Sequence, residues 1–105
     1  VWMNPPYGRE TGRWLSRLAS HGNGIALIFA RTDTRMFHSH IWNVADAIFF
    51  FKGRLKFYTV EGVESGTAGA ASCLIAYGDY NSTTLKEGDI AGKYVPLTVN
   101  KEARP

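Results

Sequence analysis

The sequence of 105 residues contains a single cysteine, Cys73, so it cannot form an intramolecular disulfide bond. This excludes the small secreted domains that depend on disulfide bonds, and it favours a reducing, cytoplasmic setting. Cys73 lies in the apolar segment 72–77, where we expect it to pack as a small hydrophobic side chain. No apolar run approaches the roughly 18 residues of a membrane-spanning helix, and the first residues lack the pattern of a signal peptide. We therefore expect no membrane association.

The composition is that of a chain that folds into one domain. Hydrophobic residues make up 45% of the sequence and aromatic residues 13%, which excludes a disordered polypeptide. The formal net charge is +3, from 12 basic and 9 acidic residues. A nucleic-acid partner is compatible with this charge, although many proteins without such a partner are equally basic.

The order of apolar segments predicts an α/β fold. Helical spacing of apolar residues predicts a helix over 10–20 and a second over 35–44. The segments 24–30 and 47–51 are apolar throughout, which is typical of strands that are covered on both faces. A further strand is predicted at 72–77, and its connection to the 47–51 strand shows no helical pattern. We therefore expect these two strands to pair antiparallel.

Two segments lack any strong pattern. The small residues of 64–71 predict an exposed loop, and the polar region after residue 80 predicts an irregular tail over 81–105 with one weak strand candidate at 94–97. We therefore expect residues 1–80 to be the folded, functional part of the chain and residues 81–105 to be a tail. Trp14 and Trp42 fall at apolar helix positions and are expected in the core.

The beginning of the chain places a rigid turn at the end of a strand. Residues 1–3 read as the last part of a strand, which the prolines of the following Asn4-Pro5-Pro6-Tyr7 segment then end. In open parallel sheets, ligands bind beyond the carboxyl ends of the strands. The polar segment 31–34 follows the next predicted strand, so we expect the two polar segments to lie side by side.

The Asn-Pro-Pro-Tyr segment has the groups that an amine-methylating site requires. The exocyclic amine of adenine is a poor nucleophile, and two acceptors aimed at its hydrogens would make it reactive. The side-chain oxygen of Asn4 and the carbonyl of Pro5 are such acceptors, with Pro6 as a stiffener. Tyr7 offers a face on which a base can stack, worth ~1–3 kcal/mol. The alternative is a surface turn or a ligand for a small adaptor domain.

Four blocks carry a more specific resemblance: V-W-M-N-P-P-Y-G, A-R-T-D-T-R-M-F, F-F-F-K-G-R-L-K-F and S-C-L-I-A-Y-G. Together they cover about residues 1–80, and in this order the sequence resembles the phage-type DNA N-6-adenine methyltransferases, the Dam-like family. The resemblance implies a Rossmann-like methyltransferase sheet, S-adenosylmethionine as methyl donor and double-stranded DNA as substrate. It also implies a catalytic role for Asn4, Pro5, Pro6 and Tyr7, with Asn4 close to the donor.

The second and third blocks supply the DNA-binding candidates. The second block matches the family at a polar segment, and the third combines basic side chains with aromatic ones, so that charge and stacking coexist. The residues assigned to DNA on this basis are Arg31, Thr32, Asp33, Thr34, Lys52, Arg54, Lys56 and Phe57. The basic stripe Arg9, Arg13 and Arg17 is more typical of a solvated helix face. The three histidines and Cys73 form no recognisable metal site.

One part of the family pattern is missing. The donor-binding half of such enzymes has a glycine-containing turn after its first strand, and no such turn precedes Asn4. The sequence is therefore expected to be the carboxyl-terminal half of a methyltransferase. An inactive remnant that binds DNA or a protein is the alternative. A homodimer that pairs through an exposed sheet edge is a further expectation.

Overall fold

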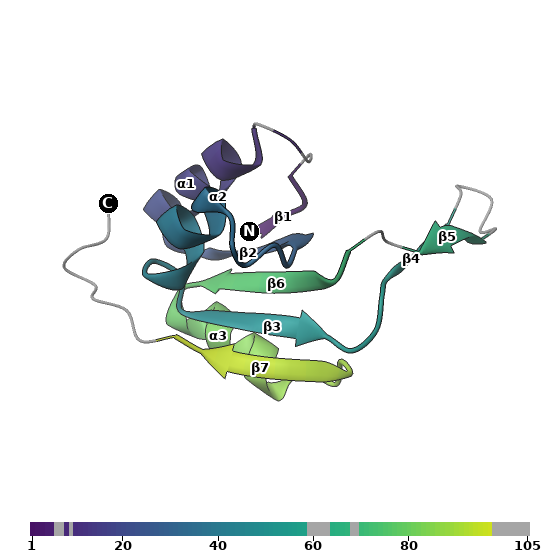
Figure 1. Cartoon of the computed structure of the whole chain (residues 1–105). Coiled ribbons are helices and arrows are strands. Elements are labelled where there is room, and N and C mark those ends of the chain that lie inside the picture. The colour runs from purple at the N-terminus through teal and green to yellow at the C-terminus, as the bar shows by residue number, and fades with distance from the viewer. Residues whose placement is uncertain (6–7, 9, 59–63, 68–69, 98–105) are drawn as a thin grey trace.

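A five-stranded mixed sheet forms the centre of the computed structural model, which describes residues 1–5, 8, 10–58, 64–67 and 70–97. Its strands lie in the order β1-β2-β6-β3-β7 (Figure 1). Their bounds are Trp2–Met3 for β1, Gly24–Phe29 for β2, Ser72–Tyr77 for β6, Ala47–Phe51 for β3 and Gly92–Pro96 for β7. The predicted α/β class is confirmed at this level.

The pairing of the strands follows the expected pattern. β1 pairs parallel with β2, with Trp2 opposite Ile25 and Met3 opposite Ala26. β6 lies between β2 and β3 and runs antiparallel to both, and the expected pairing of 72–77 with 47–51 has Ala47 opposite Ala76. β1, β2 and β3 therefore share one direction, and their carboxyl ends lie at the same edge of the sheet.

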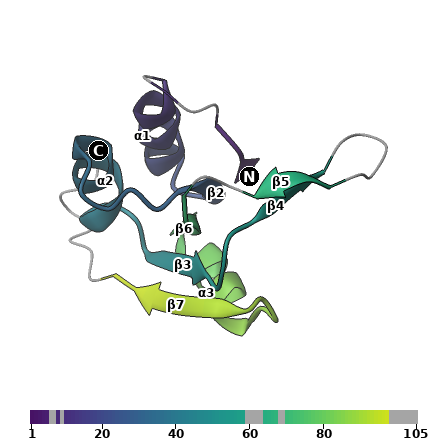
Figure 2. The ribbon, with the colours of Figure 1, turned by 45° about the vertical axis from the view of Figure 1, so that its right-hand side comes forward.

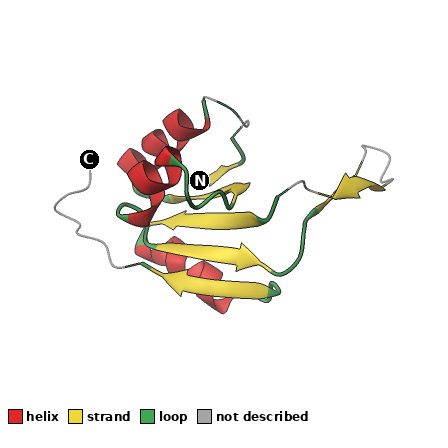
Figure 3. Ribbon diagram, viewed as in Figure 1, coloured by secondary structure: helices red, strands yellow, loops and turns green. Residues whose placement is uncertain are grey.

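Helices cover both faces of this sheet (Figure 3). On one face, α1 (Thr11–His21) and α2 (Arg35–Phe37) pack with the short π-helix η1 (His38–Trp42). The other face is covered by α3 (Asp79–Glu87). Because successive side chains of a strand point to opposite faces, each strand contributes to two cores. The first core contains Leu15, Leu18, Ile28, Phe37, Ile41, Ile75 and Tyr77, and the second contains Ala47, Phe49, Leu74, Ala76 and Leu85.

The two predicted helices are present, with one irregularity. α1 ends at Gly22, which has φ +74° and donates its N–H to the Leu18 carbonyl, a left-handed stop that favours glycine. The predicted helix over 35–44 changes to π geometry at His38. The Tyr77 hydroxyl donates a hydrogen bond of 2.6 Å to the His40 carbonyl there, so a core strand holds the irregular turn.

Two predictions of irregular structure were wrong. The supposed tail forms α3 and β7, and β7 extends the sheet by pairing with β3, so the folded unit continues past residue 80. The helix of α3 was missed because its sequence, DYNSTTLKE, contains few apolar residues; only Asn81 and Leu85 are buried. Part of the supposed loop 64–71 is the strand β5 (Glu64–Thr67).

The prediction for Trp14 was also wrong. Its side chain is 41% exposed, because α1 turns Leu15 and Leu18 toward the sheet and leaves Trp14 at the border of the covered face. Trp42 is partly buried against the first core, and its indole N–H donates to the Thr32 carbonyl at 3.2 Å. Cys73 is fully buried, as predicted.

Among the described residues, no helix combines the length and the apolar character that crossing a bilayer requires.

Candidate functional site

The carboxyl edge of β1 and β2 brings two of the predicted site segments to neighbouring strands. Asn4 follows β1 directly and is exposed, whereas Pro5 is buried. The other two residues of the motif, Pro6 and Tyr7, lie outside the described residues. The described half of the motif therefore consists of an accessible amide followed by a proline that is fixed in the protein.

The segment 31–34 after β2 is a compact turn held by its own hydrogen bonds. The Arg31 N–H donates to the Phe29 carbonyl at 2.9 Å, and the Thr34 hydroxyl donates to the Arg31 carbonyl at 2.8 Å. The Thr34 side chain also accepts from the Phe37 N–H at 3.3 Å and so caps α2. Thr32 and Asp33 are exposed at the tip of the turn. This loop has a defined shape before any ligand binds.

A pocket of about 420 Å³, called the inner pocket here, lies beside this turn. Its volume falls in the range of roughly 300–1,000 Å³ that small-molecule sites occupy. The Arg31 guanidinium lies 5.5 Å from the centre of the Phe29 ring, which places a cation against an aromatic wall. The described lining residues are Gly8, Thr11, Phe29, Arg31, Thr34 and Met36. The described lining thus combines apolar walls with one cation and the hydroxyls of two threonines.

Asn4 lines a different pocket from Arg31. Met3 pairs with Ala26, and β2 continues three residues further to Phe29, roughly 10 Å at about 3.3 Å per residue. Along the strand direction, Asn4 therefore lies before the level at which the 31–34 turn begins. It lines a pocket of about 290 Å³, the outer pocket, with Trp2, Met3, Pro5 and Trp14. The two segments follow neighbouring strands as predicted, but their described residues line different pockets instead of lying side by side in one. Gly8, which comes after the Asn4 segment in the chain, lines the inner pocket with Arg31.

The third predicted segment begins a separate two-stranded ribbon at the same edge of the sheet. Lys52 and Arg54 are exposed, and Gly53 between them has φ +78°, a left-handed backbone conformation that favours glycine. Lys56 and Phe57 belong to β4 (Lys56–Tyr58), which pairs antiparallel with β5. Their backbone positions are described and their side chains are not. Both views show the ribbon extending away from the sheet and helices (Figure 2).

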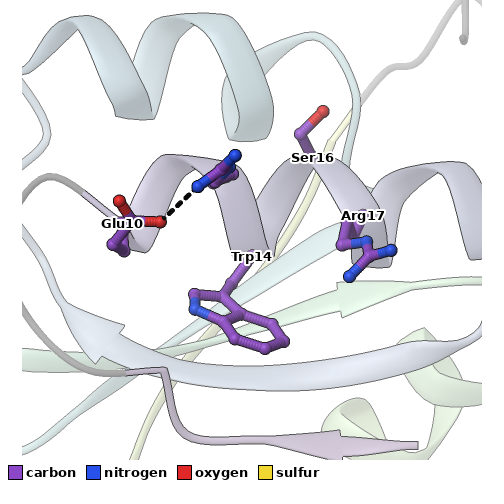
Figure 4. A pocket seen from close by; sticks show the side chains of 5 residues that line it. Glu10, Trp14, Ser16 and Arg17 are labelled. Carbon is purple, nitrogen blue, oxygen red and sulfur yellow. Dashed lines mark hydrogen bonds and ion pairs between the residues drawn. The ribbon is translucent and has the colours of Figure 1, made fainter.

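A groove on α1 is the feature that the sequence predictions missed. It measures about 440 Å³ and is lined by Glu10, Arg13, Trp14, Ser16 and Arg17. Trp14 and Arg17 extend from one side of α1, while Arg13 pairs with Glu10 at 2.9 Å (Figure 4). The basic stripe on α1 was the available signal. Because Trp14 was expected in the core, the sequence did not predict that its side chain lines a groove together with Arg13 and Arg17.

The residues described so far do not form a complete site for S-adenosylmethionine. A donor of this type needs a partner for its ribose hydroxyls, usually a carboxylate, and backbone N–H groups at a glycine turn. The described lining of the outer pocket contains the Asn4 amide and aromatic faces, but no carboxylate and no glycine turn. Asn4 can contact a bound donor there, and the remaining contacts would have to come from elsewhere.

The thiol of Cys73 is not placed or charged as a nucleophile would be. Burial raises the pKa of the Cys73 thiol from 9.0 to about 12, so this thiol stays protonated and unreactive at neutral pH. Within the described ranges, no cluster of three or more His, Cys, Asp or Glu side chains is placed to hold a metal ion.

Comparisons with models of protein families, with curated proteins and with solved structures found no match to this chain.

Proposed function

We propose that this chain is the amine-binding part of a DNA adenine methyltransferase. The observation that carries the proposal is the position of Asn4-Pro5 directly after a parallel strand of an α/β sheet, at the edge where ligands bind in such folds. The four sequence blocks that resemble the Dam-like family support the same assignment. The Arg31 turn and the Lys52–Arg54 segment follow β2 and β3 at this edge as well.

The chemistry assigned to this edge is activation of an exocyclic amine. The Asn4 side-chain oxygen and the Pro5 carbonyl would each accept one of the amine hydrogens, drawing the nitrogen lone pair out of conjugation with the ring. They would also stabilise the positive charge that grows on this nitrogen during methyl transfer. The ring of Pro5 fixes its φ, and a following proline in the sequence restricts its ψ to extended values, so its carbonyl would be aimed before the substrate arrives. By the resemblance, S-adenosylmethionine supplies the electrophilic methyl group.

The inner pocket gives this substrate a second point of attachment. Its apolar wall of Phe29 and Met36 suits a base or a sugar that has left the duplex. Arg31 is exposed at the same pocket, and we assign its guanidinium to a phosphate of the substrate strand. A target nucleotide would then be held by its amine at Asn4 and by its backbone at Arg31.

The test is methyl transfer by the Asn4→Ala variant of the full protein, using donor labelled in its methyl group and duplex DNA. Loss of one aligned polar group in comparable sites costs about 10²–10³ in rate, so we expect a decrease of that size with DNA affinity retained. Asn43→Ala is the matched control, because Asn43 is also an exposed asparagine and lies after η1. Near-normal transfer by Asn4→Ala would refute the proposal.

The incomplete donor site favours a second candidate function. The chain would then bind DNA or a protein without transferring a methyl group. Calorimetric titration with S-adenosylmethionine separates the two candidates. Tight binding of the donor to this chain contradicts a module without catalytic function. The homodimer through an exposed edge stays a prediction for β1, whose Trp2 side chain is 61% exposed; light scattering that shows only monomers would refute it.

A further inference from the structure

We infer that Trp42 is a positioning residue, whose indole N–H holds the 31–34 turn, and with it Arg31, in the shape that receives a phosphate of the substrate. The inference rests on the proposed function, which assigns the Arg31 guanidinium to that phosphate. The sequence predicted that Trp42 would lie in the core. Its side chain is partly buried there, but its polar group is used outside the core, where the indole N–H donates to the Thr32 carbonyl at 3.2 Å.

The Arg31 side chain is available to an anion. Within the described part of the chain, no carboxylate forms an ion pair with its guanidinium, which lies 5.5 Å from the centre of the Phe29 ring. A long, exposed side chain loses rotamer freedom when it binds a phosphate, and this loss weakens binding. Fixing the backbone from which the side chain extends lowers that cost. The shape of the 31–34 turn therefore affects the affinity for the phosphate.

Two successive carbonyl groups of this turn are held by side chains. The Arg31 carbonyl accepts from the Thr34 hydroxyl at 2.8 Å, and the Thr32 carbonyl accepts from the Trp42 indole. A carbonyl that could rotate toward the inner pocket would present an acceptor to the phosphate, which is itself an acceptor. Thr34 belongs to the turn, whereas Trp42 is ten residues later and lies in η1. Trp42 therefore ties the turn to a separate helical segment.

The π geometry of η1 fixes Trp42 against the core. In an α-helix, positions five apart differ by about 140° around the axis, so Phe37 and Trp42 would point apart. In π geometry, the backbone hydrogen bonds join residues five apart. The two rings accordingly pack with their centroids 5.1 Å apart, and Phe37 is fully buried. The Tyr77 hydroxyl holds the same helical turn from β6 through the His40 carbonyl. The indole is thus anchored on one side, while its N–H reaches the 31–34 turn.

The first test uses the free protein and follows the exchange of N–H groups by NMR. The indole N–H of Trp42 should exchange about two- to tenfold more slowly than those of the exposed Trp2 and Trp14, the range that one hydrogen bond gives. Trp42→Phe keeps an aromatic ring beside Phe37 and removes the N–H. In this variant the Thr34 amide, which donates to the Arg31 carbonyl at 3.2 Å, should exchange faster by a similar factor. Equal exchange of the three indoles, or an unchanged Thr34 amide, would overturn the inference.

The second test is a double-mutant cycle on the binding of a labelled DNA duplex at several salt concentrations. Arg31→Gln should weaken binding and lower the slope of log K against log salt by about 1, the value of one phosphate contact. Trp42→Phe should weaken binding by about two- to tenfold in the wild-type background. In the Arg31→Gln background it should have no further effect, because it acts through Arg31. The same loss in both backgrounds would show that Trp42 only stabilises the fold, and would contradict the inference.

Tyr94→Phe is the matched control for Trp42→Phe. The Tyr94 hydroxyl shares a hydrogen bond of 2.6 Å with the Ser82 hydroxyl, between β7 and α3, and β7 is the strand at the opposite edge of the sheet from β1. The control therefore also removes one side-chain hydrogen bond of a partly buried aromatic residue, and thermal unfolding compares the stability of the two variants. Tyr94→Phe should keep the wild-type DNA affinity and salt slope. A loss of affinity equal to that of Trp42→Phe would count against the inference.

The results also separate this inference from the proposed function. If the cycle shows coupling between Trp42 and Arg31 but the wild type transfers no methyl group, the proposed function fails and the role of Trp42 stands. If the wild type methylates adenine and Arg31→Gln weakens DNA binding while Trp42→Phe does not, only the role of Trp42 fails. If Arg31→Gln leaves the affinity unchanged, the phosphate assignment fails and the inference fails with it. A wild-type protein without affinity for DNA would refute both.

Discussion

β6 and β1 belong to the same sheet but have opposite surroundings. All six residues of β6 are buried, and the strand has a partner on each side. β1 is two residues long and has β2 as its partner in the sheet, and Trp2 is 61% exposed. Stability is therefore concentrated in the middle of the sheet, while the groups assigned to chemistry follow its short edge strand. Substitutions in the two regions should consequently affect different measurements.

The largest expected effect on stability comes from Ile75→Ala in β6. Ile75 is fully buried in the first core, and removing such a side chain leaves a cavity that costs about 2–5 kcal/mol in unfolding free energy. Denaturant unfolding measures this loss. Trp2→Ala at the edge is the control and should stay within about 0.5 kcal/mol, as for other exposed positions. Equal losses at both sites would contradict the contrast between centre and edge.

An intermediate effect is expected from Cys73 at alkaline pH. Its pKa in the folded protein is raised to about 12, above the value of 9.0 for the exposed thiol. The unfolded chain therefore loses this proton first, so the contribution of Cys73 is fully present below pH 9 and is lost as the pH rises toward 12. In that window the unfolding free energy should fall by about 1.4 kcal/mol per pH unit from this group.

Comparison with Cys73→Ala isolates the contribution of the thiol, because the other titrating groups are common to both proteins. The difference in stability between wild type and variant should shrink as the pH rises above 9. A constant difference from pH 8 to pH 11 would show that Cys73 titrates normally and is not buried.

The smallest expected effect is at the candidate site itself. Thr34→Ala removes the cap of α2 and the hydroxyl that closes the Arg31 turn, which should cost about 1 kcal/mol in unfolding free energy. Thr84→Ala is the matched control: Thr84 lies inside α3, where its hydroxyl bonds the Tyr80 carbonyl four residues earlier, and its loss should be nearly neutral. A larger loss for Thr84→Ala would contradict this assignment.

The same contrast explains which features the sequence could predict. Apolar runs identified β2, β3 and β6, because strands that are buried on both faces are uniformly apolar. The lack of a helical pattern in the connection gave the antiparallel pairing of β3 with β6. α3 could not be predicted in this way. Its polar sequence folds as a helix because Leu85 and Asn81 are held against the sheet, and Asn81 donates to the Tyr77 carbonyl at 2.9 Å.

The sequence could predict which strand ends carry the candidate site residues, but not that these residues line two separate pockets. The proline turn and the 31–34 segment were correctly placed at the ends of neighbouring strands. That β2 extends beyond β1, so that Asn4 and Arg31 line different pockets, depends on the register between strands, which local patterns do not encode. The ribbon was missed for a related reason, since its pairing joins Lys56 to Thr67 across a segment with no apolar alternation.

The most direct test of the central claim is the identity of the base that the full protein methylates. Duplex DNA would be incubated with S-adenosylmethionine and either wild-type or Asn4→Ala protein, then digested to nucleosides and examined by mass spectrometry. The account predicts N6-methyldeoxyadenosine with the wild type and a decrease of at least about 100-fold with the variant. Equal amounts with both proteins, methylation of cytosine instead, or no methylated nucleoside with the wild type would contradict it.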